Sequence, residues 1–405
     1  MLTREDALLY DADDGLAFAR ARFSLPPGVI YLDGNSLGAL PRRTAARVAD
    51  TVTKEWGEGL IRSWNDADWI NAPAKLGARI ARLVGAEAEE VIVTDSVSIN
   101  VFKLAAAALA LRPGRRVIVT EAGNFPTDLY MLQGLSRLTG AELRVVPTAG
   151  IAAALDDSVA LLLLTHTHYR TGAVLDMAGL TAAAHAAGAL ACWDLSHSAG
   201  ALALDLNGAD ADMAVGCGYK YLNGGPGAPA FASVAARHHA ELEQPLTGWF
   251  GHAAPFDFVD DYRPGAGMQR LLVGTPSVIG MAALASGLAT FDGVDIVAAA
   301  AKSRALGDLF LDLAAESCPQ LTVACPRDHR GAQVSLSHPD AYPIMQALIA
   351  RGVIGDFRAP DVLRFGFPAL YVRFVDVWDA VAILADVMEH EDWRAPAHQQ
   401  RRAVT

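Results

Sequence analysis

Two residues of this sequence have the types and positions that cofactor-dependent carbon chemistry needs. Asp194 ends one apolar stretch, and Lys220 follows the next apolar stretch along the chain. A buried carboxylate beside a protonated ring nitrogen, plus a lysine that forms a Schiff base, is what a pyridoxal phosphate electron sink requires. Each residue alone has a simpler interpretation, because strand-end aspartates are often caps and most lysines are solvated. Together with Phe125, which could stack on a ring, and His197, three residues after the aspartate, they favour the cofactor.

A serine pair between an apolar run and a helix predicts a place for an anion. Ser96 and Ser98 follow the run 91–94 and lie at the start of the helical stretch 98–111. First-turn N–H groups and the positive end of the helix dipole favour an anion there, and hydroxyls add donors. A plain helix cap is the simpler interpretation of the serines by themselves. The lysine and aspartate described above make a phosphate site the favoured one.

The segment 34–38 suggests a different chemistry, because it matches the G-x-S-x-G nucleophile elbow of α/β-hydrolases. A serine esterase that uses Ser36 is therefore the alternative from another mechanistic class. Ser36 lies too early in the chain, however, for the strands and the oxyanion loop that normally precede the elbow. A turn is the favoured interpretation.

Other candidate ligands form no supporting pattern. The histidine pairs lack carboxylates or cysteines at suitable spacing, so no metal site is predicted: His166 with His168, and His238 with His239. The cysteines show no C-x-x-C spacing and are interpreted as reduced, buried, small hydrophobes: Cys192, Cys217, Cys318 and Cys325. No G-x-G-x-x-G follows a strand and no P-loop is present, so neither a dinucleotide nor a nucleoside triphosphate is predicted.

The elements that must position these residues alternate between about residues 90 and 235. Short, almost continuously apolar runs alternate with helical stretches, which is typical of a mostly parallel sheet covered by helices on both faces. Ligands of such sheets bind beyond the carboxyl ends of the strands, where the candidate residues fall. The expected strands are 91–94, 116–120, 143–146, 159–164, 189–194, 213–218 and 228–234, and the expected helices are 98–111, 126–138 and 176–187.

Beyond residue 275 a few helices and short strands predict a second, smaller α+β domain. We expect a large α/β domain over 46–280, and a small domain made of 1–45 and 281–405.

Composition excludes several classes of protein. Of 405 residues, 52% are apolar and 19% charged, which excludes disorder for the bulk of the chain. The longest apolar runs fall short of the roughly 20 residues that span a bilayer, so no membrane association is predicted. The net charge of −12 and the lack of a basic cluster beyond Arg401-Arg402 make nucleic acid a poor partner. The N-terminus has no basic segment ahead of an apolar one, so we expect a cytoplasmic protein with a small-molecule substrate.

Seven segments, in order along the chain, carry a resemblance to a known family. They are LDGNSLG at 32–38, NFPTD at 124–128, YRTG at 169–172, WDLSHSAG at 193–200, YKYLNGG at 219–225, GWFGH at 248–252 and RFG at 364–366. They resemble kynureninase, a family in the aspartate aminotransferase-like, fold type I group of pyridoxal phosphate enzymes. The resemblance covers about residues 30 to 390 and implies a large domain with a mostly parallel seven-stranded sheet plus a smaller α+β domain.

The resemblance also implies a role for each matching residue. Lys220 would hold pyridoxal 5'-phosphate as a Schiff base and later act as a base, and Asp194 would pair with the ring nitrogen. Tyr219 would donate a proton late in the reaction, so the implied catalytic residues are Lys220, Tyr219 and Asp194. The implied cofactor-binding residues are Val97, Ser98, Phe125, Pro126, Thr127, Asp128, Thr165, Asp194, His197, Tyr219, Lys220, Trp249 and Thr275. The implied substrate-binding residues are Arg364, which would bind the α-carboxylate, Trp64 and Asn35.

The reaction that the resemblance implies is hydrolysis of the Cβ–Cγ bond of L-kynurenine to anthranilate and L-alanine, in tryptophan catabolism, by a homodimer. Trp64, Gly274 and Thr275 look like the bacterial catabolic type, which favours L-kynurenine over 3-hydroxykynurenine. A cysteine desulfurase-like lyase or an aminotransferase is the alternative within the same fold, although none of the cysteines lies in an obvious polar loop. A non-catalytic pyridoxal-binding protein is the remaining alternative, and the combination of Asp194, Lys220 and Arg364 argues against it.

Overall fold

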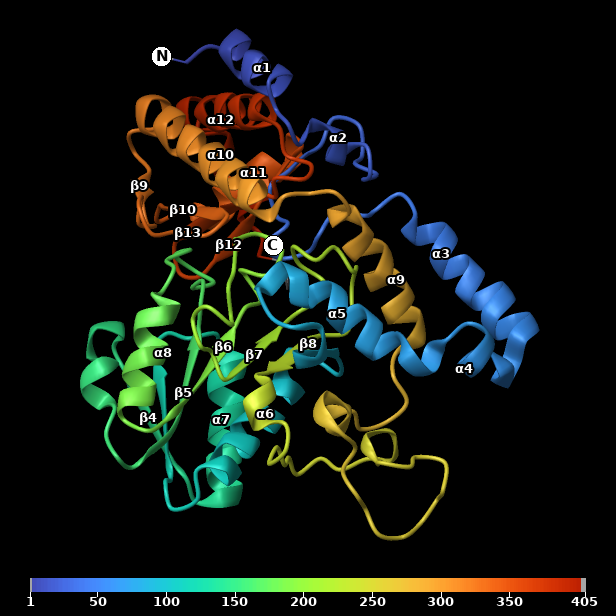
Figure 1. Cartoon of the computed structure of the whole chain (residues 1–405). Helices are drawn as coiled ribbons and strands as arrows, with labels where there is room; N and C mark the ends of the chain where they lie inside the picture. Colours follow the sequence, from blue (N-terminus) through green and yellow to red (C-terminus); the bar gives the residue numbers. More distant parts are fainter. Residues whose placement is uncertain (1, 402–405) are drawn as a thin grey trace.

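A seven-stranded sheet forms the centre of the computed structural model, which describes residues 2–401 (Figure 1). Its strand order is β2-β8-β7-β6-β5-β3-β4, and β8 runs opposite in direction to the other six strands. The prediction of a mostly parallel seven-stranded sheet is confirmed. The strands are β2 (Val91–Val93), β3 (Val117–Glu121), β4 (Glu142–Val146), β5 (Val159–Thr165), β6 (Leu190–Asp194), β7 (Met213–Gly216) and β8 (Phe231–Val234).

The near-continuous apolar runs follow from burial of both sheet faces. Along β5, Leu161 and Leu163 pack into one apolar cluster with side chains of α6 and α7, whereas Leu162 and Leu164 pack into a second cluster on the opposite face. Because successive side chains of a strand point to opposite faces, every position must then be apolar. The helices of this part are α3 (Thr44–Asp50), α4 (Ser63–Asp66), α5 (Ala72–Val84), α6 (Val97–Leu111), α7 (Pro126–Thr139), α8 (Met177–Ala186) and α9 (Val278–Leu288).

Local sequence signals place the helix ends. Ser96 precedes α6, and its hydroxyl accepts a hydrogen bond from the backbone N–H of Ile99 at 3.4 Å. Pro126 is the first residue of α7, where a missing N–H costs nothing. Gly140 ends α7 in the left-handed conformation with φ 72°. These residues set where α6 begins and where α7 begins and ends.

The C-terminal part forms an antiparallel four-stranded sheet of order β12-β13-β10-β9. The N-terminal segment joins it, because β1 pairs with β11 and the Asp11 carboxylate accepts from the first backbone N–H groups of α12. In Figure 1, α1, α10 and α12 gather at the top of the molecule. The elements are α1 (Arg4–Ala12), α2 (Ala17–Arg20), β1 (Ile30–Tyr31), α10 (Ile296–Ser317), β9 (Thr322–Val323), β10 (Gln333–Ser337), α11 (Ala341–Ala350), β11 (Val353–Ile354), β12 (Asp356–Arg358), β13 (Val362–Gly366), α12 (Phe374–Glu389) and α13 (Pro396–Gln399). The domain limits at residues 45 and 280 stay a prediction.

No single helix within residues 2–401 is long and apolar enough to cross a membrane. Helices α9 and α10 meet the length and composition criteria only as a pair, and the pair is bent by 84°.

Candidate active site

The carboxyl ends of the central strands bring the predicted chemistry-bearing residues together. Thr165 ends β5 and Asp194 ends β6, and the two are register partners across the parallel pair. Lys220 lies in the loop after β7, the next strand of the sheet. Strand β2 runs in the same direction as β7, because each is antiparallel to β8, so Val97 and Ser98 begin α6 at the same edge. This edge is where open α/β sheets bind ligands.

The amine of Lys220 faces a histidine, whereas the amines of the other lysines face carboxylates. Its Nζ lies 3.0 Å from Nε2 of His197, and both side chains are buried. Each of the other four lysines pairs with a carboxylate within 2.7 Å. Burial, and next the charge of Lys220, hold the pKa of His197 well below its usual value, so the imidazole is neutral and accepts from the lysine. Lys220 is thus a buried amine without a direct carboxylate partner among residues 2–401.

Two buried carboxyl groups, Asp194 and Asp128, lie beside that amine. One oxygen of Asp194 accepts from the backbone N–H and the hydroxyl of Ser196, at 2.8 and 2.6 Å. Asp128 of α7 lies 3.5 Å from the hydroxyl of Thr165, and its other oxygen has no hydrogen-bond partner within residues 2–401. Burial, and then the charge of Asp194, raise the pKa of Asp128 well above the usual range. Burial also raises the pKa of Asp194, against the hydrogen bonds from Ser196 and the charge of Lys220.

Two aromatic rings flank the lysine. The Nζ atom of Lys220 lies 5.8 Å from the ring centre of Phe125 and 5.7 Å from that of Tyr219. Phe125 is held at the start of α7, directly before Pro126 and Thr127, and its ring meets the ring of Tyr169 edge to face. Burial raises the pKa of the Tyr219 hydroxyl, so this group keeps its proton. The predicted stacking residue is therefore placed beside the amine.

The loop 33–38 closes over the backbone of Lys220. The N–H of Gly38 donates to the carbonyl of Tyr219 at 2.8 Å, and a Cβ added at Gly38 would lie 2.3 Å from the carbonyl oxygen of Lys220. Asn35, in the same loop, is completely buried, and its side-chain oxygen and nitrogen have no partner among residues 2–401. The G-x-S-x-G segment is therefore a tight turn packed on the lysine loop, as the sequence favoured.

Arg364 is buried and held from three sides. Its guanidinium donates from two nitrogens to the carboxylate of Asp356, from Nη2 to the hydroxyl of Ser36 at 2.9 Å, and from Nη1 to the carbonyl of Tyr169. A second arginine, Arg358, lies 2.7 Å from the same carboxylate. The charge of Arg364 also lowers the pKa of His197, after burial and the charge of Lys220. Through Ser36, whose loop packs on the Lys220 backbone, the structure links the predicted carboxylate-binding arginine to the lysine loop.

Three predicted site residues lie elsewhere in this single chain. Trp64, Trp249 and Thr275 line a cavity of about 770 Å³ that none of the Lys220 group lines. The Trp64 and Trp249 rings meet edge to face with centres 6.3 Å apart. Around them, large apolar side chains are exposed: Ile61, Phe256 and Phe258.

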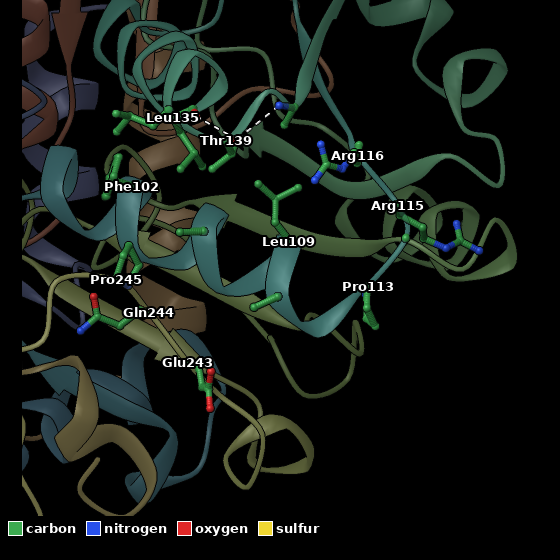
Figure 2. Close-up of a pocket in the computed structure, with 15 residues that line it drawn as sticks. Phe102, Leu109, Pro113, Arg115, Arg116, Leu135, Thr139, Glu243, Gln244 and Pro245 are labelled. Carbon is green, nitrogen blue, oxygen red and sulfur yellow. Dashed lines mark hydrogen bonds between the residues drawn. The ribbon is translucent and has the colours of Figure 1, made fainter. Parts of the chain in front are cut away.

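A second cavity, of about 560 Å³, lies beside the amino ends of β3 and β4, away from the carboxyl ends where Lys220 lies. Figure 2 shows it between α6 and α7, bordered by Leu109, Leu135 and the segment that leads into β3 with Arg115 and Arg116. It contains none of the predicted site residues.

Four residues of the site had no role predicted from the sequence: Tyr169, Ser196, Asp356 and Arg358. Ser196 has the signal of standing two residues after Asp194, where its N–H can reach back to a strand-end carboxylate. Asp356 and Arg358 alternate along a strand of three residues, a pattern too short to recognise without its partner strand.

Comparisons with known proteins point in one direction. A family model described as Kynureninase C-terminal domain matches residues 299–384. The protein named Kynureninase from Burkholderia mallei (strain SAVP1) is 53% identical over 416 aligned positions, which cover 100% of both chains. The one from Pseudomonas fluorescens is 49% identical, again over 100% of both chains.

Solved structures show the same fold. The cysteine desulfurase CsdA from Escherichia coli superposes with a TM-score of 0.78, at 20% identity, over 93% of this chain and 99% of its own. A C-DES mutant with glycine covalently linked to its PLP cofactor gives a TM-score of 0.77, at 18% identity, over 91% and 99%. The predicted fold type I class is confirmed.

Proposed function

This chain belongs to the kynureninase family, and we propose that the Lys220 site is where it cleaves L-kynurenine to anthranilate and L-alanine with pyridoxal phosphate. The enzyme class and the cofactor follow from relatives that match the whole chain at about half identity. The observation that carries the assignment to this site is the buried Lys220 amine, 3.0 Å from a neutral His197 and beside two buried carboxyl groups.

The side chains at this edge fit pyridoxal phosphate. Two buried polar atoms here have no hydrogen-bond partner among residues 2–401 and are free to bind a ligand: an oxygen of Asp128 and Nδ1 of His197. Lys220 would hold the cofactor through its amine, and Asp194 would face the ring nitrogen. Phe125 would cover one ring face, and the first turn of α6 at Val97 and Ser98 would receive the phosphate.

Bound pyridoxal phosphate supplies an electron sink that stabilises negative charge developing on the substrate. Asp194 contributes a buried negative charge that favours a protonated ring nitrogen, and Ser196 fixes its orientation. Lys220, once its amine is free, is the base placed to take a proton from the substrate's α-carbon. Tyr219 holds a proton that it can give to the β-carbon of the alanine unit after anthranilate has left, because burial keeps its hydroxyl protonated. Arg364 binds the α-carboxylate and so fixes which end of the substrate faces the lysine.

We propose a homodimer in which Trp64, Trp249 and Thr275 reach the site of the neighbouring subunit. The support is their position in an aromatic cavity apart from Lys220, ringed by exposed apolar side chains such as Phe258, which is 80% exposed. The aromatic lining offers few hydrogen-bond acceptors to a ring hydroxyl, which favours L-kynurenine over 3-hydroxykynurenine.

Anthranilate fluorescence tests the function. Purified protein with pyridoxal phosphate should release anthranilate from L-kynurenine, and Lys220→Ala should abolish the release. The ratio of kcat/KM for L-kynurenine to that for 3-hydroxykynurenine should exceed one. Wild-type protein that leaves L-kynurenine unchanged under these conditions would overturn the assignment, and Tyr219→Phe with unchanged turnover would remove the tyrosine from it.

A further inference from the structure

The donors of Arg364 are almost fully used inside the protein. A guanidinium has five N–H groups. Nε donates to Oδ1 of Asp356 at 2.8 Å, Nη2 donates to Oδ2 of Asp356 and to Ser36 Oγ at 2.9 Å, and Nη1 donates to the Tyr169 carbonyl. These bonds use four donors and leave one on Nη1. A substrate carboxylate would therefore meet an arginine whose plane and direction are already fixed.

Asp356 is the group that fixes this plane. Its carboxylate is 2% exposed and also accepts from the hydroxyl of Ser36 at 2.6 Å and from Arg358 at 2.7 Å. Asp356 therefore ties the strand β12 and the loop 33–38, which lies on the Lys220 backbone, to one arginine. Two-pronged pairing of this kind gives orientation as well as attraction.

The strands themselves do not need this carboxylate. Asp356 and Arg364 are register partners in an antiparallel pair that continues through Phe357 with Leu363 and Arg358 with Val362. The backbone hydrogen bonds of that pair do not involve the side chain at position 356. What the carboxylate adds is the direction of a long, otherwise flexible side chain.

The charged groups around Ser36 carry a net positive charge. Arg364 and Arg358 bring two positive charges and Asp356 one negative charge. The fourth group, Asp33, has a buried oxygen with no partner among residues 2–401, and burial, then the charge of Asp356, raise its pKa to about 7. With Asp33 neutral, one net positive charge remains for an anionic substrate group.

We propose that Asp356 is a positioning residue that holds Arg364 in one orientation for the α-carboxylate of the substrate, so that it sets substrate affinity without touching the substrate. The inference rests on the proposed function, because it takes a substrate with an α-carboxylate as given. It assigns to β12 a part of substrate recognition, alongside the arginine on β13.

Asp356→Asn keeps the shape of the side chain and removes its charge and one acceptor. We expect the KM for L-kynurenine to rise about 10- to 100-fold while kcat changes less than about threefold, since a misaligned contact costs on that scale. The visible spectrum of bound pyridoxal phosphate should stay unchanged. The inhibition constant of kynuramine, the analogue without the carboxylate, should also stay unchanged, and a merely structural role would shift both inhibition and spectrum.

The matched control is Asp361→Asn. Asp361 lies between β12 and β13 and pairs with Arg170 at 3.2 Å and with the Ser337 hydroxyl at 2.8 Å. The substitution therefore removes an arginine–aspartate pair from the same sheet, although this pair is more exposed than that of Asp356. This variant should keep the wild-type KM. An unchanged KM in Asp356→Asn, or a kynuramine inhibition constant that rises as much as the KM, would overturn the positioning role.

A second readout separates this inference from the proposed function. Titration of the cofactor spectrum with L-alanine measures α-carboxylate binding without turnover. If the wild type makes no anthranilate but responds to L-alanine, the proposed function fails, and a weaker L-alanine response in Asp356→Asn still supports the positioning role. An L-alanine dissociation constant equal in wild type and Asp356→Asn contradicts it.

Discussion

The contact between the loop 33–38 and the lysine loop makes Gly38→Ala a sharp test of the site's construction. The added methyl carbon would lie 2.3 Å from the Lys220 carbonyl oxygen, 2.5 Å from Oδ1 of Asn223 and 2.8 Å from Cα of Asn223. Favourable contacts of this kind need about 3.5 Å, so the two loops must separate by roughly 1 Å. Overpacking of this size should lower the free energy of unfolding by about 1–3 kcal/mol.

The separation of the two loops should also lower catalytic activity. A displacement of the Lys220 backbone by about 1 Å is expected to lower kcat/KM roughly 10²-fold. Anthranilate release gives kcat/KM, and urea denaturation followed by circular dichroism gives the unfolding free energy.

The control is Gly134→Ala, in the middle of α7, where an added Cβ meets nothing within 4 Å. This variant should be more stable than wild type by about 0.5–1 kcal/mol and fully active, because alanine favours a helix. If Gly38→Ala kept wild-type activity and stability, the two loops would not pack as described, and the reasoning would be refuted.

Three further outcomes are expected. Hydrogen bonds from His238 and from a backbone amide hold the pKa of Asp212 well below its usual value despite burial. Asp212→Asn should therefore lower the free energy of unfolding by about 3–5 kcal/mol at neutral pH, and this loss should shrink below about pH 4. A loss of equal size in acid would contradict the prediction. Burial and a neighbouring carboxylate raise the pKa of Asp33 to about 7, so this group becomes charged as the pH rises through 7. The KM for L-kynurenine should rise over the same pH range, and Asp33→Asn should flatten that rise. A pH profile of KM that is the same in Asp33→Asn and wild type would rule out this role of Asp33. Mixing the variants Lys220→Ala and Trp249→Ala should restore activity through mixed dimers with one intact site, whereas a mixture as inactive as its parts would argue against a shared site.

The sheet and its strand-end residues were predictable because their signals are local. Most of the central strands are nearly continuous apolar runs, and Asp194 ends β6 directly after such a run, so burial and direction can be read together. The limits of the strands shifted by a few residues, for example at β8, expected from 228 and found from Phe231. The three residues before it, Ala-Pro-Ala at 228–230, are apolar but lie outside the strand.

The parts that stayed out of reach depend on contacts between distant segments. The bond between Ser36 and Asp356 joins residues 320 positions apart, and β12 has only three residues, so no local pattern announces the pair. Trp64 and Trp249 were assigned to the substrate and cofactor sites by resemblance, and a single chain places them together in a different cavity. The role proposed for them depends on a second subunit, which one chain's sequence does not position.

The most direct test of the central claim is the mass of the peptides obtained after adding pyridoxal phosphate, reducing with borohydride and digesting the protein. Reduction fixes the cofactor to the amine that holds it. We predict one pyridoxyl group, on the peptide that contains Lys220, and none on Lys103 or Lys302, whose amines are paired with carboxylates. A protein that gains no pyridoxyl group, or gains it on another lysine while Lys220 stays unmodified, would contradict the account.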